Sequence, residues 1–232
     1  CSRDWSSDVC SSDLSSLDSR SRGGLHAAVG ARGAGGGVVN GRAERADEDL
    51  LDDVDVLVVG GGVVGCAVLR ELSGFDIRVA MVEARHDIGD ATSKANTAIL
   101  HTGFDAVPGS QESTLVARGY ALLSDYASRT GIPVESTGAL LVAWDEEQLA
   151  ALPSLLAKAE KNGYRDCVLV DATTVYDRVP HLGPGALGGL AVPGESIICP
   201  WTTPLAYATE ALARGAHVHL AAAVESVEVG PE

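Results

Sequence analysis

The spacing of apolar positions changes repeatedly after residue 53, and each change predicts a new element of secondary structure. Val54 to Val59 is a short, largely β-branched run, which is typical of a strand buried on both faces of a parallel sheet. Cys66 to Leu72 then follows helical spacing, with Val64 and Val68 on one side. A second apolar run, Arg78 to Val82, predicts another strand, so this segment has the pattern of a βαβ unit.

The same alternation continues toward the carboxyl end. It predicts helices at 111–130, 145–162, 171–179 and 203–215, and strands at 138–144, 167–170, 187–192, 217–220 and 224–229. The first of these helices has an apolar stripe that includes Leu115 and Leu122. We expect Pro153 to kink or divide the second, and Thr203 to cap the last, with Pro204 at its first position. The pattern predicts an α/β protein.

A glycine-rich turn joins the first strand to the first helix. Gly60, Gly62 and Gly65 form the pattern G-x-G-x-x-G. The first glycine allows a tight turn, the second lets the backbone approach a pyrophosphate, and the third lets the helix pack against the strand. Backbone amides and the positive end of the helix dipole then bind phosphate. The predicted cofactor-binding residues of this loop are Gly60, Gly61, Gly62, Val63, Val64 and Gly65.

An acidic residue follows the second strand. Glu83 lies eighteen positions after Gly65, close to the spacing of a carboxylate that accepts hydrogen bonds from a ribose. Ala84 comes next and is included in the predicted site. A plain βαβ unit with a glycine turn and a solvated Glu is the alternative. Strand, loop, helix, strand and acid together favour a dinucleotide site.

Composition narrows the classes of protein. The 232 residues suffice for one large or two small domains, and the formal net charge of −15 argues against binding to nucleic acid or to an anionic membrane surface. No apolar run is long enough to span a membrane. Cys66 and Cys199 have the pattern of small buried residues in a reducing compartment. His217 and His219 lack a third ligand at suitable spacing, so no metal site is predicted.

The first 52 residues differ from the rest. They are rich in Ser, Gly, Arg and Asp and have neither periodicity nor the apolar region of a signal peptide. Asp4 to Leu14 matches the translation of a common sequencing-library adapter, so we expect residues 1–14 to be adapter read-through. A disordered tail is the alternative. We expect residues 1–52 to take no part in the fold.

The segment after Glu83 carries a more specific likeness. It contains G-x-x-T-S-x-x-N-x-x-x-L-H-x-G, from Gly89 to Gly103, and such long loops inside a domain are usually functional. Together with the glycine loop and Glu83, this segment resembles the FAD-dependent oxidoreductases of the D-amino-acid oxidase superfamily. The nearest branch is similar to the flavin glycerol-3-phosphate dehydrogenases and L-2-hydroxyglutarate oxidases. The resemblance covers about 54–229 and implies FAD as the cofactor.

The resemblance also implies roles for individual residues. Thr92 and Ser93 would contact the pyrophosphate, Asn96 and Thr97 would lie near the flavin ring, and Val224 would lie near the adenine. Helix capping is the alternative role for Thr92 and Ser93, and the two roles are compatible.

His101 is the imidazole within this segment. It is a candidate proton acceptor or substrate ligand, because its charge changes near neutral pH. A purely structural role is the alternative. The residues after His-x-Gly depart from the glycerol-3-phosphate enzymes, which tend to have an Arg there for the substrate phosphate. This chain has Phe104, Asp105 and Ala106 instead, and an Asp repels phosphate. Glycerol 3-phosphate is therefore disfavoured unless a later Arg supplies the charge.

The resemblance implies a domain plan and a reaction. We expect a Rossmann-like FAD-binding domain at 53–133 and 200–232, an inserted α+β substrate domain at 134–199, and the carboxyl-terminal part of a longer enzyme to be absent. The reaction would be hydride transfer from a small 2-hydroxy acid or polyol phosphate to flavin. Amine oxidation and a non-catalytic dinucleotide-binding module are the alternatives. The electron acceptor stays open, and we expect a cytoplasmic protein, free or peripheral to a membrane.

Overall fold

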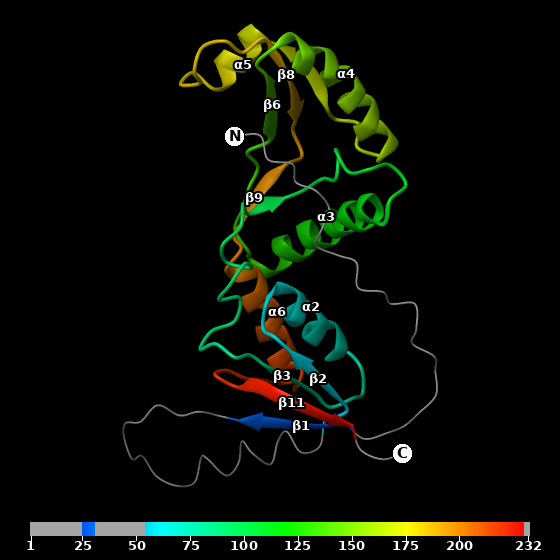
Figure 1. Ribbon diagram of the computed structural model, residues 1–232, viewed down its shortest axis with the longest axis vertical. Coiled ribbons are helices and arrows are strands. Elements are labelled where there is room, and N and C mark those ends of the chain that lie inside the picture. Colours follow the sequence, from blue (N-terminus) through cyan, green and yellow to red (C-terminus); the bar gives the residue numbers. More distant parts are fainter. Residues whose placement is uncertain (1–24, 31–53, 230–232) are drawn as a thin grey trace.

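The computed structural model describes residues 25–30 and 54–229, arranged as an elongated molecule (Figure 1). The predicted adapter segment and most of the predicted tail therefore lie outside the described residues. Helices α2 and α6 and strands β2 and β3 gather at one end, and α4, α5, β6 and β8 gather at the other. Helix α3 lies between the two ends (Figure 1).

One end contains a parallel sheet. It consists of β2 (Val56–Val59), β3 (Val79–Val82) and β10 (His217–His219), in the order β10-β3-β2. Helix α2 (Val63–Leu72) connects β2 to β3, and α6 (Thr202–Ala213) precedes β10. Residues more than 130 positions apart thus meet in one sheet.

The burial of this sheet differs from the prediction for its first strand. All four residues of β3 are buried, but β2 is only partly buried and Val59 is 62% exposed. Within the described residues β2 is an edge strand, whereas β3 has neighbours on both sides. An apolar run indicates a strand suited to burial, but it does not determine the position of that strand in the sheet.

Helix α2 also shows a different face to the core than the sequence indicated. Cys66 and Leu69 are fully buried against Met81 and Ala211, whereas Val64 is 74% exposed and Val68 is 43% exposed. The helix is apolar on two sides, so its pattern did not distinguish the side that packs. The packed side is the one that faces β3 and α6.

The other end contains an antiparallel sheet. Its strands are β6 (Ala139–Ala143), β7 (Val168–Asp171) and β8 (Gly188–Val192), in the order β6-β8-β7. Helices α4 (Glu146–Lys161) and α5 (Ala172–Arg178) pack against it. Every residue of β8 is buried, and Leu190 and Val192 join Phe104 and Leu152 in one hydrophobic cluster.

Helix α3 (Gln111–Thr130) matches its predicted range. Ser110 caps it by accepting a hydrogen bond from Ser113 N at 3.1 Å, and Gly131 ends it at φ 73°. Its predicted stripe is only partly buried, since Leu115 and Leu122 are 55% and 60% exposed. A small sheet that the sequence did not indicate lies beside it and consists of β4 (Ile99–Leu100), β9 (Ser196–Ile198) and β5 (Val134–Glu135). Strands of two or three residues are too short to show a period.

Helix α4 is a single element that contains Pro153, so this proline does not divide it. The predicted cap of α6 was wrong. Thr203 does not cap α6, because the helix begins at Thr202, and the Thr203 hydroxyl donates to Cys199 O at 2.9 Å. Pro204 is still within the first turn, where the missing N–H has no partner to lose.

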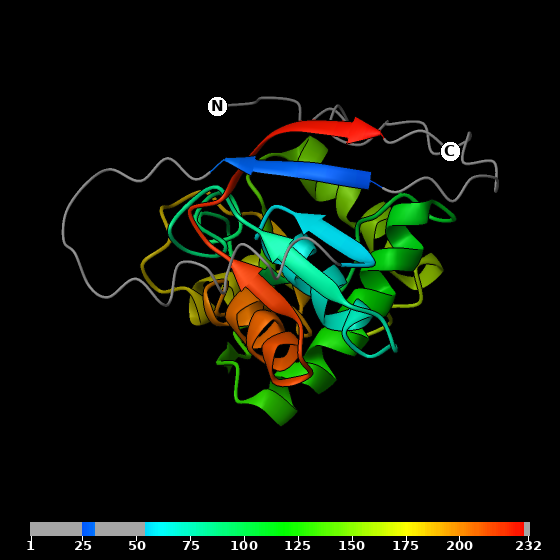
Figure 2. The ribbon, with the colours of Figure 1, turned by 90° about the horizontal axis from the view of Figure 1, so that it is seen from below.

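Strand β11 (Ala223–Val229) pairs with a segment of the predicted tail. Leu25–Gly30 forms β1, antiparallel to β11, and the pair lies beside the parallel sheet (Figure 2). The expectation that residues 1–52 take no part in the fold is therefore wrong for these six residues. Among the described helices, none combines the length and apolarity needed to cross a membrane.

Candidate functional site

The glycine loop has the geometry that its three glycines predict. Gly60 has a φ of +102°, a conformation that side chains with a Cβ rarely adopt. A Cβ on Gly65 would lie 1.9 Å from Gly60 O, so only glycine allows α2 to begin this close to the end of β2. A Cβ on Gly62 would meet the Ser93 hydroxyl at 3.3 Å. The loop thus brings bare backbone to the amino end of a helix.

Glu83 lies directly against this loop. Its Oε2 accepts a hydrogen bond from Gly61 N at 2.6 Å, and its Oε1 accepts one from Arg85 N at 2.8 Å. A carboxylate has about four acceptor positions, so both oxygens can still accept bonds from two neighbouring hydroxyls. Ala84 is exposed beside it. This arrangement suits a ribose diol, and the contact of Glu83 with a ribose stays a prediction.

Ser93 reaches the start of α2 from thirty residues away. Its Oγ accepts a hydrogen bond from Val63 N at 2.9 Å, although the residue that precedes the helix, Gly62, makes no side-chain cap. The amides of Val64 and Gly65 belong to the first turn and have no earlier carbonyl to bind. Ser93 therefore caps α2, a helix that is distant from it in the sequence. It lies where an anion would be held.

The thiol of Cys66 donates a hydrogen bond to the backbone of this loop. Cys66 is fully buried, its Sγ donates to Gly61 O at 3.4 Å, and burial raises the pKa of the thiol to about 11. It is a neutral packing group, as the sequence suggested. Cys199 is only partly buried, contrary to the expectation, and a hydrogen bond with Thr202 lowers the pKa of its thiol.

The segment after Ser93 is held by its own polar side chains. Asn96 Nδ2 donates to Thr92 O at 3.1 Å and to Ser93 O at 2.9 Å, and Asn96 Oδ1 accepts from Ala98 N at 2.7 Å. Ala98 has a φ of 58°, which this bracket helps to maintain. Asn96 is thus occupied with the loop backbone, whereas Thr92 and Thr97 are exposed. Their predicted contacts with the flavin stay predictions.

Val224 is half-buried in β11. The residues just before it lie beside the acidic residue of the loop, because Ala222 N donates to Glu83 O at 2.9 Å and Ala221 N donates to Arg85 O at 2.8 Å. The start of β11 and the end of β3 therefore meet, although about 140 residues separate them. The predicted contact of Val224 with the adenine stays a prediction.

His101 lies at the wall of a separate cavity of about 780 Å³. Its side chain is 41% exposed, Nε2 lies 3.4 Å from Asp105 Oδ1, and Nδ1 lies 3.2 Å from Glu195 Oε1. The hydrogen bond with Glu195 raises the pKa of His101, against the opposing effect of burial. Other residues that line the cavity are Ala67, Arg70, Ile99, Val116, Arg118 and Tyr207.

Glu195 is a site residue that the sequence did not reveal. It is 4% exposed, and its Oε1 accepts from Thr102 N at 2.8 Å and from the Thr102 hydroxyl at 2.7 Å. Burial alone raises the pKa of Glu195, but the bonds from His101 and Thr102 outweigh it, so the pKa is lowered. A lone Glu between Gly194 and Ser196 carries no motif that could have indicated this role.

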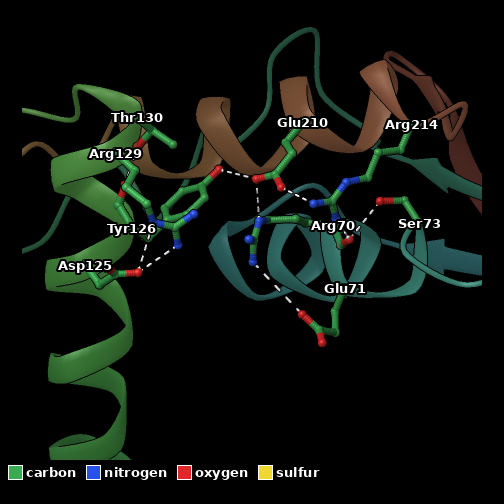
Figure 3. Close-up of polar contacts among 9 residues, drawn as sticks. All are labelled: Arg70, Glu71, Ser73, Asp125, Tyr126, Arg129, Thr130, Glu210 and Arg214. Atoms are coloured by element: carbon green, nitrogen blue, oxygen red, sulfur yellow. Dashed lines mark hydrogen bonds and ion pairs between the residues drawn. The ribbon is translucent and has the colours of Figure 1, made fainter.

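A polar cluster whose residues include Arg70 and Tyr126 lines part of the cavity and holds three helices together (Figure 3). Arg70 Nε of α2 lies 2.6 Å from Glu210 Oε2 of α6, and the Tyr126 hydroxyl of α3 donates to the same oxygen at 2.8 Å. The Arg70 guanidinium also lies 4.4 Å above the Tyr126 ring. Each polar group has a partner, so we assign this cluster to the packing of the helices that surround the cavity.

Of the two sites, the one at the glycine loop fits a flavin dinucleotide. The glycine loop, the first-turn amides of α2 and Ser93 suit a pyrophosphate, and Glu83 suits a ribose. Among the described residues no group of three or more His, Cys, Asp or Glu is arranged to hold a metal ion.

Comparisons with known proteins agree with this geometry. A glycerol 3-phosphate dehydrogenase of Caloramator mitchellensis is 32% identical over 174 residues, which are 75% of this chain and 36% of that protein. An L-2-hydroxyglutarate dehydrogenase of Caenorhabditis briggsae is 34% identical over 133 residues, or 56% of this chain and 31% of that protein. The chain thus spans about a third of the length of these relatives.

Solved structures share the fold. The reduced L-alpha-glycerophosphate oxidase of Mycoplasma pneumoniae, with FAD bound, superposes with a TM-score of 0.69 at 29% identity, over 72% of this chain and 44% of that one. A glycine oxidase of Geobacillus kaustophilus gives 0.63 at 25% identity, over 72% and 46%. The family model described as FAD dependent oxidoreductase matches residues 55–232. The chain therefore belongs to the D-amino-acid oxidase family of FAD-dependent oxidoreductases, which confirms the predicted fold and cofactor.

Proposed function

We propose that the protein containing this chain oxidises a small 2-hydroxy acid or polyol phosphate, with His101 as the proton acceptor. The observation that carries the proposal is the half-exposed imidazole at the wall of a cavity, in a chain of this family. The relatives named above as dehydrogenases of glycerol 3-phosphate and of L-2-hydroxyglutarate support the substrate class.

The residues of the glycine loop, Glu83 and Ser93 would hold the FAD. When bound, FAD supplies the hydride acceptor. The part of this chain is to remove the hydroxyl proton as the carbon loses hydride. A neutral imidazole can accept that proton at Nε2, and the raised pKa of His101 favours the protonated product.

Charge near His101 bears on the substrate. Asp105 occupies the place where an Arg for phosphate was expected, and it lies beside the imidazole. Arg118 lines the same cavity and is the kind of later Arg that could hold a substrate anion. We propose that a carboxylate or phosphate binds on the Arg118 side of the cavity, away from Asp105.

Amine oxidation is the second candidate. Asp105 and Glu195 place two carboxylates beside His101, an environment that attracts a protonated amine. The structural likeness to a glycine oxidase is consistent with this candidate. A non-catalytic nucleotide-binding module has no use for an imidazole supported in this way.

One experiment separates these candidates. The whole protein would be purified with FAD and assayed with a dye acceptor on L-2-hydroxyglutarate, glycerol 3-phosphate, glycine and sarcosine. We expect turnover of a hydroxylated substrate, and loss of that turnover in Arg118→Gln through a higher KM. Turnover of amines alone would contradict the proposal. Assays with oxygen and with quinones would identify the natural electron acceptor. A cytoplasmic location, free or peripheral to a membrane, stays a prediction that cell fractionation tests.

A further inference from the structure

We propose that Glu195 is the positioning residue of His101: its buried carboxylate holds Nδ1, so that Nε2 is the nitrogen presented to the substrate. This inference rests on the proposed function, because it gives a role to a residue that acts through His101. Glu195 lies 3.2 Å from Nδ1 and is 4% exposed, whereas the imidazole is 41% exposed. The buried carboxylate thus supports a ring that can still meet a ligand.

Glu195 is held independently of His101. Its Oε1 accepts two bonds from Thr102, from the amide at 2.8 Å and from the hydroxyl at 2.7 Å, and Thr102 is itself only 5% exposed. A buried carboxylate is costly unless such donors surround it. The carboxylate is therefore fixed by the residue next to His101 and is ready to bond the ring whatever substrate is present.

The turn that carries Glu195 is fixed as well. The Tyr164 hydroxyl accepts from Gly194 N at 2.6 Å, and the Tyr120 hydroxyl donates to Gly194 O at 2.9 Å. A Cβ on Gly194 would lie 2.6 Å from the Tyr164 hydroxyl and 3.1 Å from Thr102 Cγ2. A side chain from α3 and one from the segment just after α4 thus hold the turn between β8 and β9. These hydrogen bonds to Gly194 fix the position of the next residue, Glu195.

Nδ1 has two competing partners, and they define two states of the ring. Gly103 N lies 3.0 Å from Nδ1 and can donate to it, which puts the proton of a neutral ring on Nε2, toward Asp105. When Nδ1 carries the proton and donates it to Glu195, Nε2 has a free lone pair. Only the second state accepts a proton from a substrate, and the charge of Glu195 favours it.

Other groups that face the ring do not offer the same support. Asp105 lies at Nε2, the Phe104 ring lies 5.7 Å away, and Glu112 acts only through its charge. Asp105 competes for the nitrogen that would receive the substrate proton, so its contact must open when substrate binds. Glu195 touches the opposite nitrogen and can keep its bond throughout the reaction.

The test is Glu195→Gln in the whole protein with FAD bound. Gln keeps the size and an oxygen for Thr102 but lacks the charge that favours Nδ1–H. We expect kcat to fall about ten- to a hundred-fold with little change in KM. The rise of activity with pH should move to lower pH, since the group that raises the pKa of His101 is removed. Glu135→Gln, an exposed Glu on β5, is the matched control and should change neither.

A second readout does not need activity. The NMR titration of the His101 ring should move to lower pH in Glu195→Gln. In Glu195→Asp, which keeps the charge but places it farther from the ring, the titration should lie between those of the wild type and Glu195→Gln. If Glu195→Gln does not fold, the Asp variant alone carries the test. An unchanged titration with only a lower melting temperature would overturn the inference. A shifted titration without turnover of any hydroxylated substrate would support the Glu195–His101 coupling and count against the proposed function instead.

Discussion

The glycine loop and the His101 site are built in different ways. The loop is a short continuous segment whose form follows from steric limits on its backbone, and Gly60 and Gly65 cannot be replaced without a clash or strain. The His101 site depends on a carboxylate 94 positions away that arrives on another element. The loop suits a ligand that a large family shares, whereas the second site can vary with the substrate.

The first prediction concerns the glycine loop: Gly65→Ala should have the largest effect. The added Cβ would meet Gly60 O at 1.9 Å, so α2 must move from β2. We expect the free energy of unfolding to fall by more than about 3 kcal/mol, at the upper end of overpacking effects. We also expect the variant to lose its bound flavin. Denaturant unfolding and flavin absorbance measure both.

Gly119→Ala is the control for this change. Gly119 is inside α3, and nothing lies within 4 Å of its added Cβ. Ala should stabilise the protein by about 0.5–1 kcal/mol. Equal losses in the two variants would show that the closeness of loop and helix is not the reason for glycine.

The second prediction concerns a substitution that affects the His101 site alone. His101→Gln should lower kcat about 10²- to 10⁴-fold, the usual contribution of a general base. The protein should stay yellow, because the glycine loop is unchanged. Steady-state kinetics and the flavin spectrum of the same preparation provide the measurement. A colourless variant would show that His101 supports the flavin site rather than the reaction.

The third prediction concerns the charge at the loop. Glu83→Gln should weaken FAD binding by about 1–3 kcal/mol, the loss expected when hydrogen bonds to a charged acceptor are replaced. Calorimetric titration of the flavin-free protein with FAD measures it. Glu160→Gln, an exposed change on α4, should leave the affinity unaltered. Unchanged affinity in Glu83→Gln would mean that the carboxylate serves only Gly61 and Arg85.

The fourth prediction is smaller. Ser93→Ala removes the hydroxyl that accepts from Val63 N, which should cost about 1 kcal/mol of stability, as for loss of a helix cap. The effect on unfolding should shrink when saturating FAD supplies an anion to the same amides. Ser128→Ala, on the exposed side of α3, is a suitable comparison. An effect that is independent of FAD would place Ser93 outside the phosphate site.

The smallest effect is a pH dependence of stability. The pKa of Glu195 is lowered from 4.5, so its contribution is present above pH 4.5 and is lost as pH falls through the folded value. The pKa of His101 is raised from 6.5, so its contribution is present below pH 6.5 and is lost as pH rises through the folded value. The stability difference between wild type and Glu195→Gln should be greatest between these values. Unfolding curves at several pH values test this, and a difference independent of pH would contradict it.

Much of the fold could be predicted from the chain alone because its causes are local. Helix α3 begins at a Ser cap and ends at a glycine with positive φ, and both signals are read within a few residues. Glu83 could be proposed as a ribose ligand because it follows a strand at a fixed distance from the loop. Helical period, caps and the glycine pattern are set by neighbouring atoms, and they survive without knowledge of the tertiary structure.

Tertiary structure decided what depends on distant contacts. It alone determined which side of α2 is buried, that β2 lies at a sheet edge, and that Leu25–Gly30 pairs with β11. It also brought Glu195 to His101, and Ser93 to a helix that is not its own. A carboxylate or hydroxyl looks the same in sequence whether it meets water or a partner. Only packing removes the water and provides the partner. That is why His101 could be named from the sequence, whereas its partner Glu195 emerged only from the structure.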